Sequence, residues 1–256
     1  MAGYFYPASP DALQREIAEC LATVTRRLPL PTQPKAFIVP HAGYSYSGPV
    51  AASAYAALRA LRGRVRRVVL VGPAHRVAFR GLALSTADAF LTPLGSVDVA
   101  RDAAAALREL PQVRELDRAH SLEHSLEVQL PFLQTVLEDF QIIPLVVGDA
   151  TPEEVGGVLE ALWGGPETIF IISSDLSHYR DYASAQRIDR ATTNAIESLD
   201  AEPIDGEHAC GCRPICGMLW VARAHGLHVT TLDLRNSGDT AGDHTRVVGY
   251  GAFAFS

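Results

Sequence analysis

Short apolar runs alternate along this chain with stretches whose apolar residues recur at helical spacing. A short apolar run without helical period, bounded by proline or glycine, is typical of a buried strand. Three such runs each lead to a histidine: residues 35–39 precede His41, residues 67–72 precede His75, and residues 168–172 precede His178. Strands that alternate with helices predict a three-layer α/β fold, in which helices flank a central mixed, largely parallel sheet.

The same pattern predicts the other elements. Further strands are expected at residues 81–85, 140–147, 227–234 and 246–255, and helices at residues 10–27, 97–110, 152–163, 182–199 and 213–225. Another helix is expected to begin at Ser47, whose hydroxyl can cap it. Pro144 lies near the middle of one strand and favours an edge or bulged position, because proline cannot donate to the ladder.

Polar residues are clustered between positions 121 and 133. Leucines at positions 126, 130, 133 and 137 form a helical stripe, so His124 and Glu127 are expected one turn apart on a different face of that helix. One interpretation is a solvated face whose polar residues pair with each other. The other is a pair that orients a metal ligand or a substrate.

Length and net charge limit the classes of protein to which this chain can belong. A chain of 256 residues that is 48% hydrophobic can bury a sizeable core, and we expect one α/β domain over residues 1–256. The net charge of −7 argues against a nucleic-acid or anionic-membrane surface. No run approaches the roughly 18 apolar residues of a membrane span, and no signal peptide is evident, so we expect a cytoplasmic protein.

Histidines at the ends of strands are the strongest candidates for chemistry. In open α/β sheets the ligand crevice lies beyond the carboxyl ends of the strands, so His41 and His75 are expected to meet there. Alternatively, each histidine only bonds its own loop. Two histidines and one anionic ligand are the donor set of non-haem Fe(II) oxygenases. The candidates for that third ligand are Asp175, Glu123, Glu127 and the cysteines at 210, 212 and 216.

The cysteines do not have an iron–sulfur or zinc-ribbon spacing, because they form no paired C-x-x-C motifs. Cys20 and Cys216 are expected to be small buried residues, since each lies on a predicted helix. Cys210 precedes the helix expected to begin near Arg213. A thiolate next to Arg213 and a helix start would have a lowered pKa, which suits a metal ligand or a redox-sensitive group. Residues 43–48 nearly form the G-x-S-x-G elbow of hydrolases, but Ser47 stands where glycine is needed.

Several motifs together resemble the Memo family, which in prokaryotes is also called protein B of the AmmeMemoRadiSam system. These motifs are residues 2–7 (AGYFYP), 40–44 (PHAGY), 72–75 (GPAH), 123–127 (EHSLE), 173–178 (SSDLSH), 210–215 (CGCRPI) and 248–252 (VGYGA). The resemblance extends from end to end. It implies a fold similar to that of the class III extradiol ring-cleaving dioxygenases, which bind Fe(II) through two histidines and a glutamate.

Carried over by motif, the resemblance makes His41 and His75 metal ligands and puts Cys210 in the place of the third ligand. Asp175 and His178 would line the same pocket, with His178 in the place of the acid–base histidine. Our own hypothesis is that both are catalytic and that Asp175, three residues earlier, fixes the tautomer of His178. Fe(II) is the metal implied first, and copper or zinc are alternatives because a thiolate is a softer ligand than a carboxylate.

Three further residues are expected around this site, namely Tyr44, His124 and Glu127. The resulting hypothesis is a mononuclear metal-dependent oxidoreductase that acts on a catechol-like small molecule. The alternative is a non-catalytic metal- or peptide-binding protein that works with the AMMECR-type and radical SAM proteins implied by the family.

Overall fold

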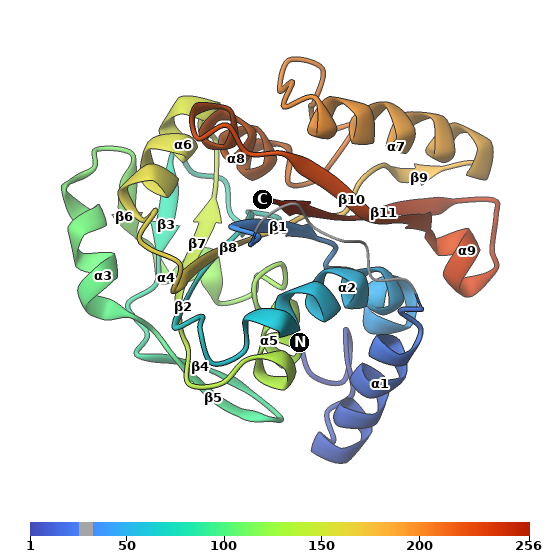
Figure 1. Cartoon of the computed structure of the whole chain (residues 1–256), viewed down its shortest axis with the longest axis horizontal. Coiled ribbons are helices and arrows are strands. Elements are labelled where there is room, and N and C mark those ends of the chain that lie inside the picture. Colours follow the sequence, from blue (N-terminus) through green and yellow to red (C-terminus); the bar gives the residue numbers. More distant parts are fainter. Residues whose placement is uncertain (26–32) are drawn as a thin grey trace.

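The computed structural model describes residues 1–25 and 33–256, and over these residues it has one large mixed sheet between layers of helices (Figure 1). The strand order is β10 (Val229–Asn236), β11 (Val247–Phe255), β1 (Ala36–Val39), β8 (Thr168–Ser173), β2 (Arg67–Pro73), β7 (Gln141–Val147), β3 (Leu82–Leu84) and β6 (Val113–Glu115). A short strand, β9 (His178–Arg180), pairs with β11, and β4 (Ala89–Thr92) forms a separate hairpin with β5 (Gly95–Asp98).

The centre of the sheet is parallel. β1 pairs with β8, β8 with β2, and β2 with β7, all in parallel register. All residues of β1 and β8 are buried, as expected for parallel strands that are covered on both faces. On either side the sheet continues antiparallel, through β11 against β1 and β3 against β7. The predicted mixed, largely parallel sheet is confirmed.

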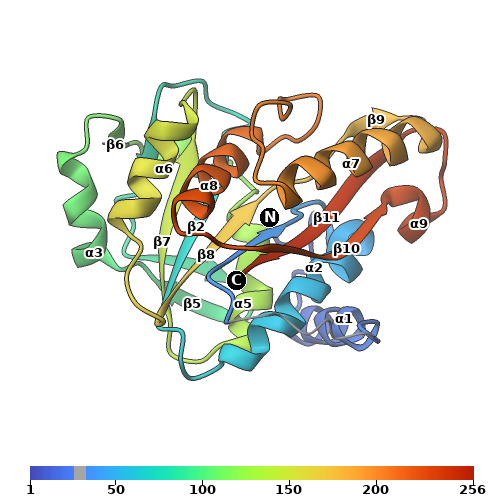
Figure 2. The same ribbon diagram turned by 45° about the horizontal axis from the view of Figure 1, so that its top comes forward.

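Helices cover both faces and enclose two hydrophobic clusters (Figure 2). One face carries α1 (Pro10–Ala22), α2 (Tyr44–Leu58) and α5 (Leu130–Val136). The other face carries α3 (Arg101–Ala105), α6 (Pro152–Ala161), α7 (Tyr182–Glu197) and α8 (Cys212–Ala224). The remaining helices are short: α4 (Asp117–His120) and α9 (Ser237–Ala241). None of the helices described is both long and apolar enough to cross a bilayer.

Helix bounds differ from the sequence prediction in three places. α2 begins at Tyr44 rather than at Ser47, whose hydroxyl donates to the carbonyl of Ala42 from within the first turn. The helix expected at residues 97–110 is shortened, because Val97 belongs to the β4–β5 hairpin. α1 ends at Ala22, and the predicted end near residue 27 lies outside the described residues.

The prediction of an edge or bulged position for Pro144 is wrong. β7 is an interior strand, and Pro144 is in register with Leu70 of β2. On its other side β7 pairs with β3 only over residues 145–147, because β3 has three residues. Pro144 thus lies just beyond the part of the ladder that β3 forms.

Gly72 allows a loop to lie against the end of β2. A Cβ atom at Gly72 would lie 2.7 Å from Ser125 Oγ and 2.9 Å from Leu126 Cδ2, closer than real Cβ atoms come to their neighbours. The Ser125 hydroxyl also donates to the carbonyl of Pro73, at 3.1 Å. The loop at residues 121–126 is therefore fixed beside the strand end that leads to His75.

Candidate metal centre

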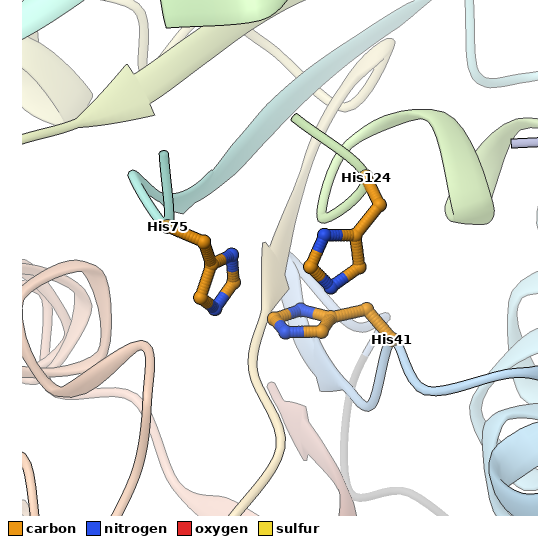
Figure 3. Close-up of side chains that lie close together, drawn as sticks. All are labelled: His41, His75 and His124. Atoms are coloured by element: carbon orange, nitrogen blue, oxygen red, sulfur yellow. The ribbon is translucent and has the colours of Figure 1, made fainter. Parts of the chain in front are cut away.

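Three histidine side chains converge beyond the carboxyl ends of the parallel strands (Figure 3). His41 follows β1, His75 follows β2, and His124 belongs to the loop before α5. One ring nitrogen from each lies within 4.8 Å of the others. The rings of His41 and His75 meet edge to face with centroids 5.2 Å apart, and those of His75 and His124 are stacked at 4.7 Å.

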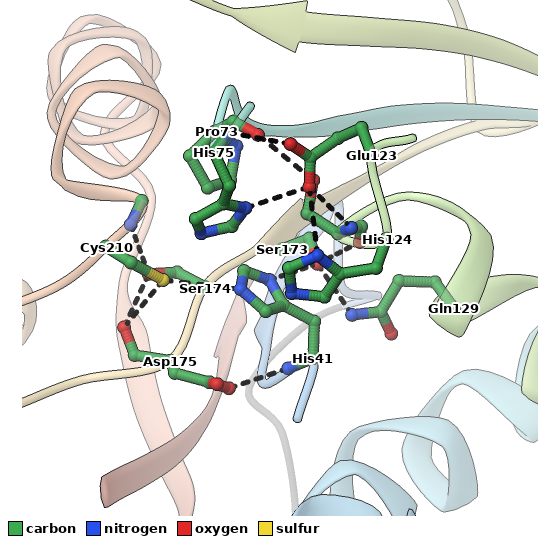
Figure 4. Close-up of polar contacts among 12 residues, drawn as sticks. His41, Pro73, His75, Glu123, His124, Gln129, Ser173, Ser174, Asp175 and Cys210 are labelled. Carbon is green, nitrogen blue, oxygen red and sulfur yellow. Dashed lines mark hydrogen bonds and ion pairs between the residues drawn. The ribbon is translucent and has the colours of Figure 1, made fainter. Parts of the chain in front are cut away.

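Hydrogen bonds fix the tautomer of His41 (Figure 4). Its Nδ1 lies 2.9 Å from Ser173 Oγ. The single hydroxyl proton of Ser173 is donated to the carbonyl of Ser125 at 2.6 Å, and the same oxygen accepts a hydrogen bond from Gln129 Nε2 at 2.7 Å. His41 Nδ1 must therefore be the donor, because Ser173 has no proton left to give. The lone pair of neutral His41 is on Nε2.

Glu123 orients His75 in the same way. Its Oε1 accepts a hydrogen bond from His75 Nδ1 at 2.8 Å, and its Oε2 accepts the backbone N–H of His75 at 2.7 Å. The backbone N–H of Ser125 donates to Oε1 at 2.9 Å. Burial would raise the pKa of Glu123, but the hydrogen bonds and charge of His75 lower it from 4.5 to about 2. The carboxylate stays ionised, and the lone pair of neutral His75 is on Nε2.

His124 is held mainly by stacking. Its ring is stacked on that of Phe5, with centroids 4.5 Å apart, and on that of His75. Its Nδ1 is 3.4 Å from Glu123 Oε1, but the alignment does not make a hydrogen bond, and this nitrogen has no partner among the described residues. His124 is thus less firmly oriented than the other two histidines.

The cluster is electrostatically suited to a metal ion. Burial, followed by the charge of His75, lowers the pKa of His41 to about 3. Burial, followed by the charges of His41 and His75, lowers the pKa of His124 to about 4. Both rings are therefore neutral near pH 7, which is the form that binds metals. A metal ion placed among these ring nitrogens would be coordinated by their lone pairs, which face one another.

These pKa shifts predict that the metal-free protein loses stability in mild acid. In the unfolded chain His41 and His124 bind protons near pH 6.5. In the folded chain the two rings stay unprotonated until the pH falls to about 3 to 4. The unfolded state therefore binds more protons over that window, so the free energy of unfolding falls as the pH drops from about 7 to about 5. Urea unfolding should show this slope, and His124→Gln should reduce it. A flat profile in both proteins would contradict the prediction.

Cys210 lies beside the cluster. Its Sγ is 3.3 Å from His41 Nε2. The expectation of a lowered thiol pKa is wrong, because burial and then the charge of Asp175 raise it well above its ordinary range. Arg213, which was expected to stabilise the thiolate, pairs instead with Asp149. Cys20 and Cys216 are buried as predicted.

Asp175 supports His41 rather than His178. Its Oδ1 accepts the backbone N–H groups of His41 at 2.7 Å and of Ala42 at 3.3 Å, and burial raises its pKa. His178 Nδ1 donates to the carbonyl of Leu176 at 2.8 Å, so the prediction that Asp175 fixes this tautomer is wrong. The charge of His178 is among the lesser causes that lower the pKa of His41.

The predicted helical pairing of His124 with Glu127 is wrong. Residues 121–126 form a loop, and the helical turn that leads into α5 begins at Glu127. Glu127 Oε1 accepts the hydroxyl of Tyr6 at 2.6 Å, and Tyr44 donates to the carbonyl of Val128 at 2.7 Å. Both residues fix the segment next to His124, but neither has a polar contact with the histidines. Sequence reasoning missed the orienting role of Glu123, whose signal was its place beside His124 in the same motif.

The fold and the cluster define a mixed α/β protein with a candidate metal centre at the carboxyl ends of its parallel strands. The family model described as Memo-like protein matches residues 1–254. The chain belongs to the Memo family.

Similar proteins of this family match the chain over nearly its whole length and nearly the whole of their own. A MEMO1 family protein of Methanococcoides burtonii is 38% identical, over 98% of this chain and 97% of that protein. Another, from Sulfolobus acidocaldarius, is 34% identical, over 98% of this chain and 95% of that protein. The crystal structure of an uncharacterised protein from Escherichia coli K12 has a TM-score of 0.59 at 14% identity, covering 86% of this chain and 99% of that one. That likeness shows a shared fold.

Proposed function

We propose that this protein is a metal-dependent oxidoreductase of the extradiol-dioxygenase type, acting on a catechol-like small molecule. The observation that carries the proposal is the pair of Nε2 lone pairs on His41 and His75, each fixed by a hydrogen bond at Nδ1. Metal-binding histidines commonly have their second nitrogen engaged in this way. Fe(II) is the metal we propose first, with copper or zinc as alternatives.

The third ligand separates two versions of this centre. We propose Cys210, because its sulfur lies 3.3 Å from His41 Nε2 on the side of Asp175. A metal ion would supply the positive charge that a thiolate needs in this buried position. The competing third ligand is His124, which completes the histidine cluster but lacks a hydrogen bond at Nδ1.

The roles of the surrounding side chains follow from their contacts. A bound metal would supply the Lewis acidity and redox chemistry of the site. His178 donates from Nδ1 to Leu176, so its Nε2 can accept a proton from a substrate hydroxyl and return it later. Asp175 holds the backbone of His41 in place and thereby positions the first histidine.

Oxygen consumption tests the proposed activity. Metal-loaded wild type should consume oxygen with at least one member of a catechol panel, and His178→Gln should lower the rate by about 100-fold or more, as expected for loss of an acid–base group. His225→Gln, beyond the far end of α8, is the matched control and should keep full activity. A metal-loaded wild type that consumes no oxygen with any catechol would contradict the oxidoreductase proposal.

Cysteine substitutions test the third ligand. Cys210→Ser should weaken metal binding by about tenfold or more, whereas Cys212→Ser, two residues along the same segment, should leave it unchanged. Peroxide should release metal from the wild type and from Cys212→Ser, because an oxidised thiol is a poorer ligand. If His124→Ala loses the metal and Cys210→Ser keeps it, the third ligand is His124.

A second candidate function is a binding protein without turnover, which would bind a peptide or work with AMMECR-type and radical SAM proteins. Exposed tyrosines favour it: Tyr46 and Tyr179 are 47% and 64% exposed. Burial raises the pKa of Tyr250, and the charges of Asp175, Tyr46 and Tyr179 raise it further. Co-purification that disappears in a Tyr46→Ser, Tyr179→Ser variant would support this function. A cytosolic location fits either proposal.

A further inference from the structure

A cavity of about 520 Å³ adjoins the histidine cluster. It lies between the loop at residues 74–81, the carboxyl end of β7 and the start of α8. Cys210 lines it, and the Cys210 sulfur is also the atom 3.3 Å from His41 Nε2 (Figure 4). Pro73 and Ala74, which lead directly to His75, form another part of the wall. A molecule in this cavity would therefore lie next to the cluster.

The wall formed by residues 74–81 is firmly attached to the sheet. The backbone N–H of Asp149 donates to the carbonyl of Phe79 at 2.7 Å, and that of Gly81 donates to the carbonyl of Asp149 at 2.8 Å. Gly148 permits this approach, because a Cβ atom there would lie 2.2 Å from the Phe79 carbonyl oxygen. The cavity is thus formed before any ligand arrives, and most of its lining is apolar, including Val77, Phe79 and Pro214.

The charged side chains that line this cavity are Arg80, Arg213 and Asp149. Two arginines line it, and Arg213 is neutralised by an ion pair with Asp149. Arg80 is exposed and belongs to none of the ion pairs among the described residues, so no carboxylate compensates its charge. The amino-terminal end of α8, at Cys212 and Arg213, also borders the cavity, and the partial positive charge of a helix start favours an anion.

We infer that this cavity binds the carboxylate of a singly charged, otherwise apolar small molecule, with Arg80 as the residue that selects for the charge. One uncompensated arginine matches one negative charge, and the apolar walls match an aromatic or aliphatic body. The inference rests on the proposed function only in that the other end of the ligand would reach the histidines.

A matched pair of probes tests the inference in metal-free protein. Dihydroxybenzoate and dihydroxybenzamide share their ring and hydroxyl groups and differ in charge. By calorimetry or ligand-observed NMR, wild type should bind the acid about tenfold more tightly than the amide, a preference that added salt reduces. Arg80→Gln should bring the two affinities within about twofold. Arg76→Gln, in the same loop but outside the cavity lining, should keep the preference.

A charge change of opposite sign sharpens the test. Asp149→Asn frees the charge of Arg213 and should increase the preference for the acid, while the backbone contacts of Asp149 remain. Equal binding of both probes by wild type, or equal effects of Arg80→Gln and Arg76→Gln, would overturn the inference. Metal content is measured separately. A protein that prefers the acid but binds no metal would refute the proposed function alone, and one that binds metal without this preference would refute the inference alone.

Discussion

Replacing His41 by alanine should abolish stoichiometric metal binding. His41 is 2% exposed, its Nδ1 is committed to Ser173, and its Nε2 faces both the other histidines and Cys210. His41 is a ligand both in the centre completed by Cys210 and in the centre completed by His124, so its removal affects either one. We expect a loss in affinity of at least about 100-fold, measured by elemental analysis after anaerobic purification and by titration with Fe(II).

Two further variants make this result interpretable. His75→Ala changes a side chain that is 27% exposed, so it should lose metal, but it also removes a hydrogen-bond donor from buried Glu123 and should lower the free energy of unfolding. His225→Ala, beyond the far end of α8, should bind metal as wild type does. The metal-centre proposal fails if wild type takes up no metal under these conditions, or if His41→Ala and His75→Ala retain it.

Glu123→Ala should affect both metal binding and stability. The carboxylate is 1% exposed and accepts hydrogen bonds from the His75 ring and from the backbone N–H groups of His75 and Ser125. Its removal leaves buried donors without partners, which we expect to cost about 3 kcal/mol of unfolding free energy. Loss of the group that orients His75 should weaken metal binding by about 10- to 100-fold.

The pH dependence identifies the carboxylate as the cause. The pKa of Glu123 is lowered from 4.5 to about 2, so its stabilising contribution is present above about pH 4.5 and is lost as the pH falls toward 2. The stability difference between wild type and Glu123→Gln should therefore shrink over that window. Glu127→Gln is the control, since Glu127 bonds Tyr6 and should not change metal affinity. Equal metal affinities of wild type and Glu123→Ala would refute the orienting role.

The strand-end histidines could be predicted because the signal is local. An apolar run that stops before His41 or His75 predicts a buried strand and the edge at which it ends, and parallel strands share that edge. The paired β1, β8 and β2 do bring these residues to one place. Asp175 was assigned to the pocket by the family resemblance, and its contact with the His41 backbone, which depends on the neighbouring strands, was not predicted.

The loop residues could not be predicted in this way. The leucines at 126, 130 and 133 are buried as a helical stripe would require, but periodicity cannot tell a helix from a loop that buries the same positions. His124 was therefore placed on a helix face, and Glu123 was not recognised as the partner of His75. The pKa of Cys210 was misjudged because nearness in sequence to Arg213 revealed neither the burial of the thiol nor the charge of Asp175, and Arg213 itself pairs with Asp149.

The position of β8 between β1 and β2 also has a consequence for how the centre is assembled during synthesis. The ribosome delivers His41 and His75 long before Thr168–Ser173, yet β1 and β2 have no hydrogen bonds to each other and are joined only through β8. A nascent chain that lacks β8 cannot set the spacing of the two histidines, which is about two strand widths, or roughly 10 Å, at the backbone. Ser173, which fixes the tautomer of His41, arrives with the same strand. Both the spacing of the two histidines and the hydrogen bond that fixes His41 thus depend on this one strand, which lies between theirs in the sheet but follows them by about a hundred residues in the chain.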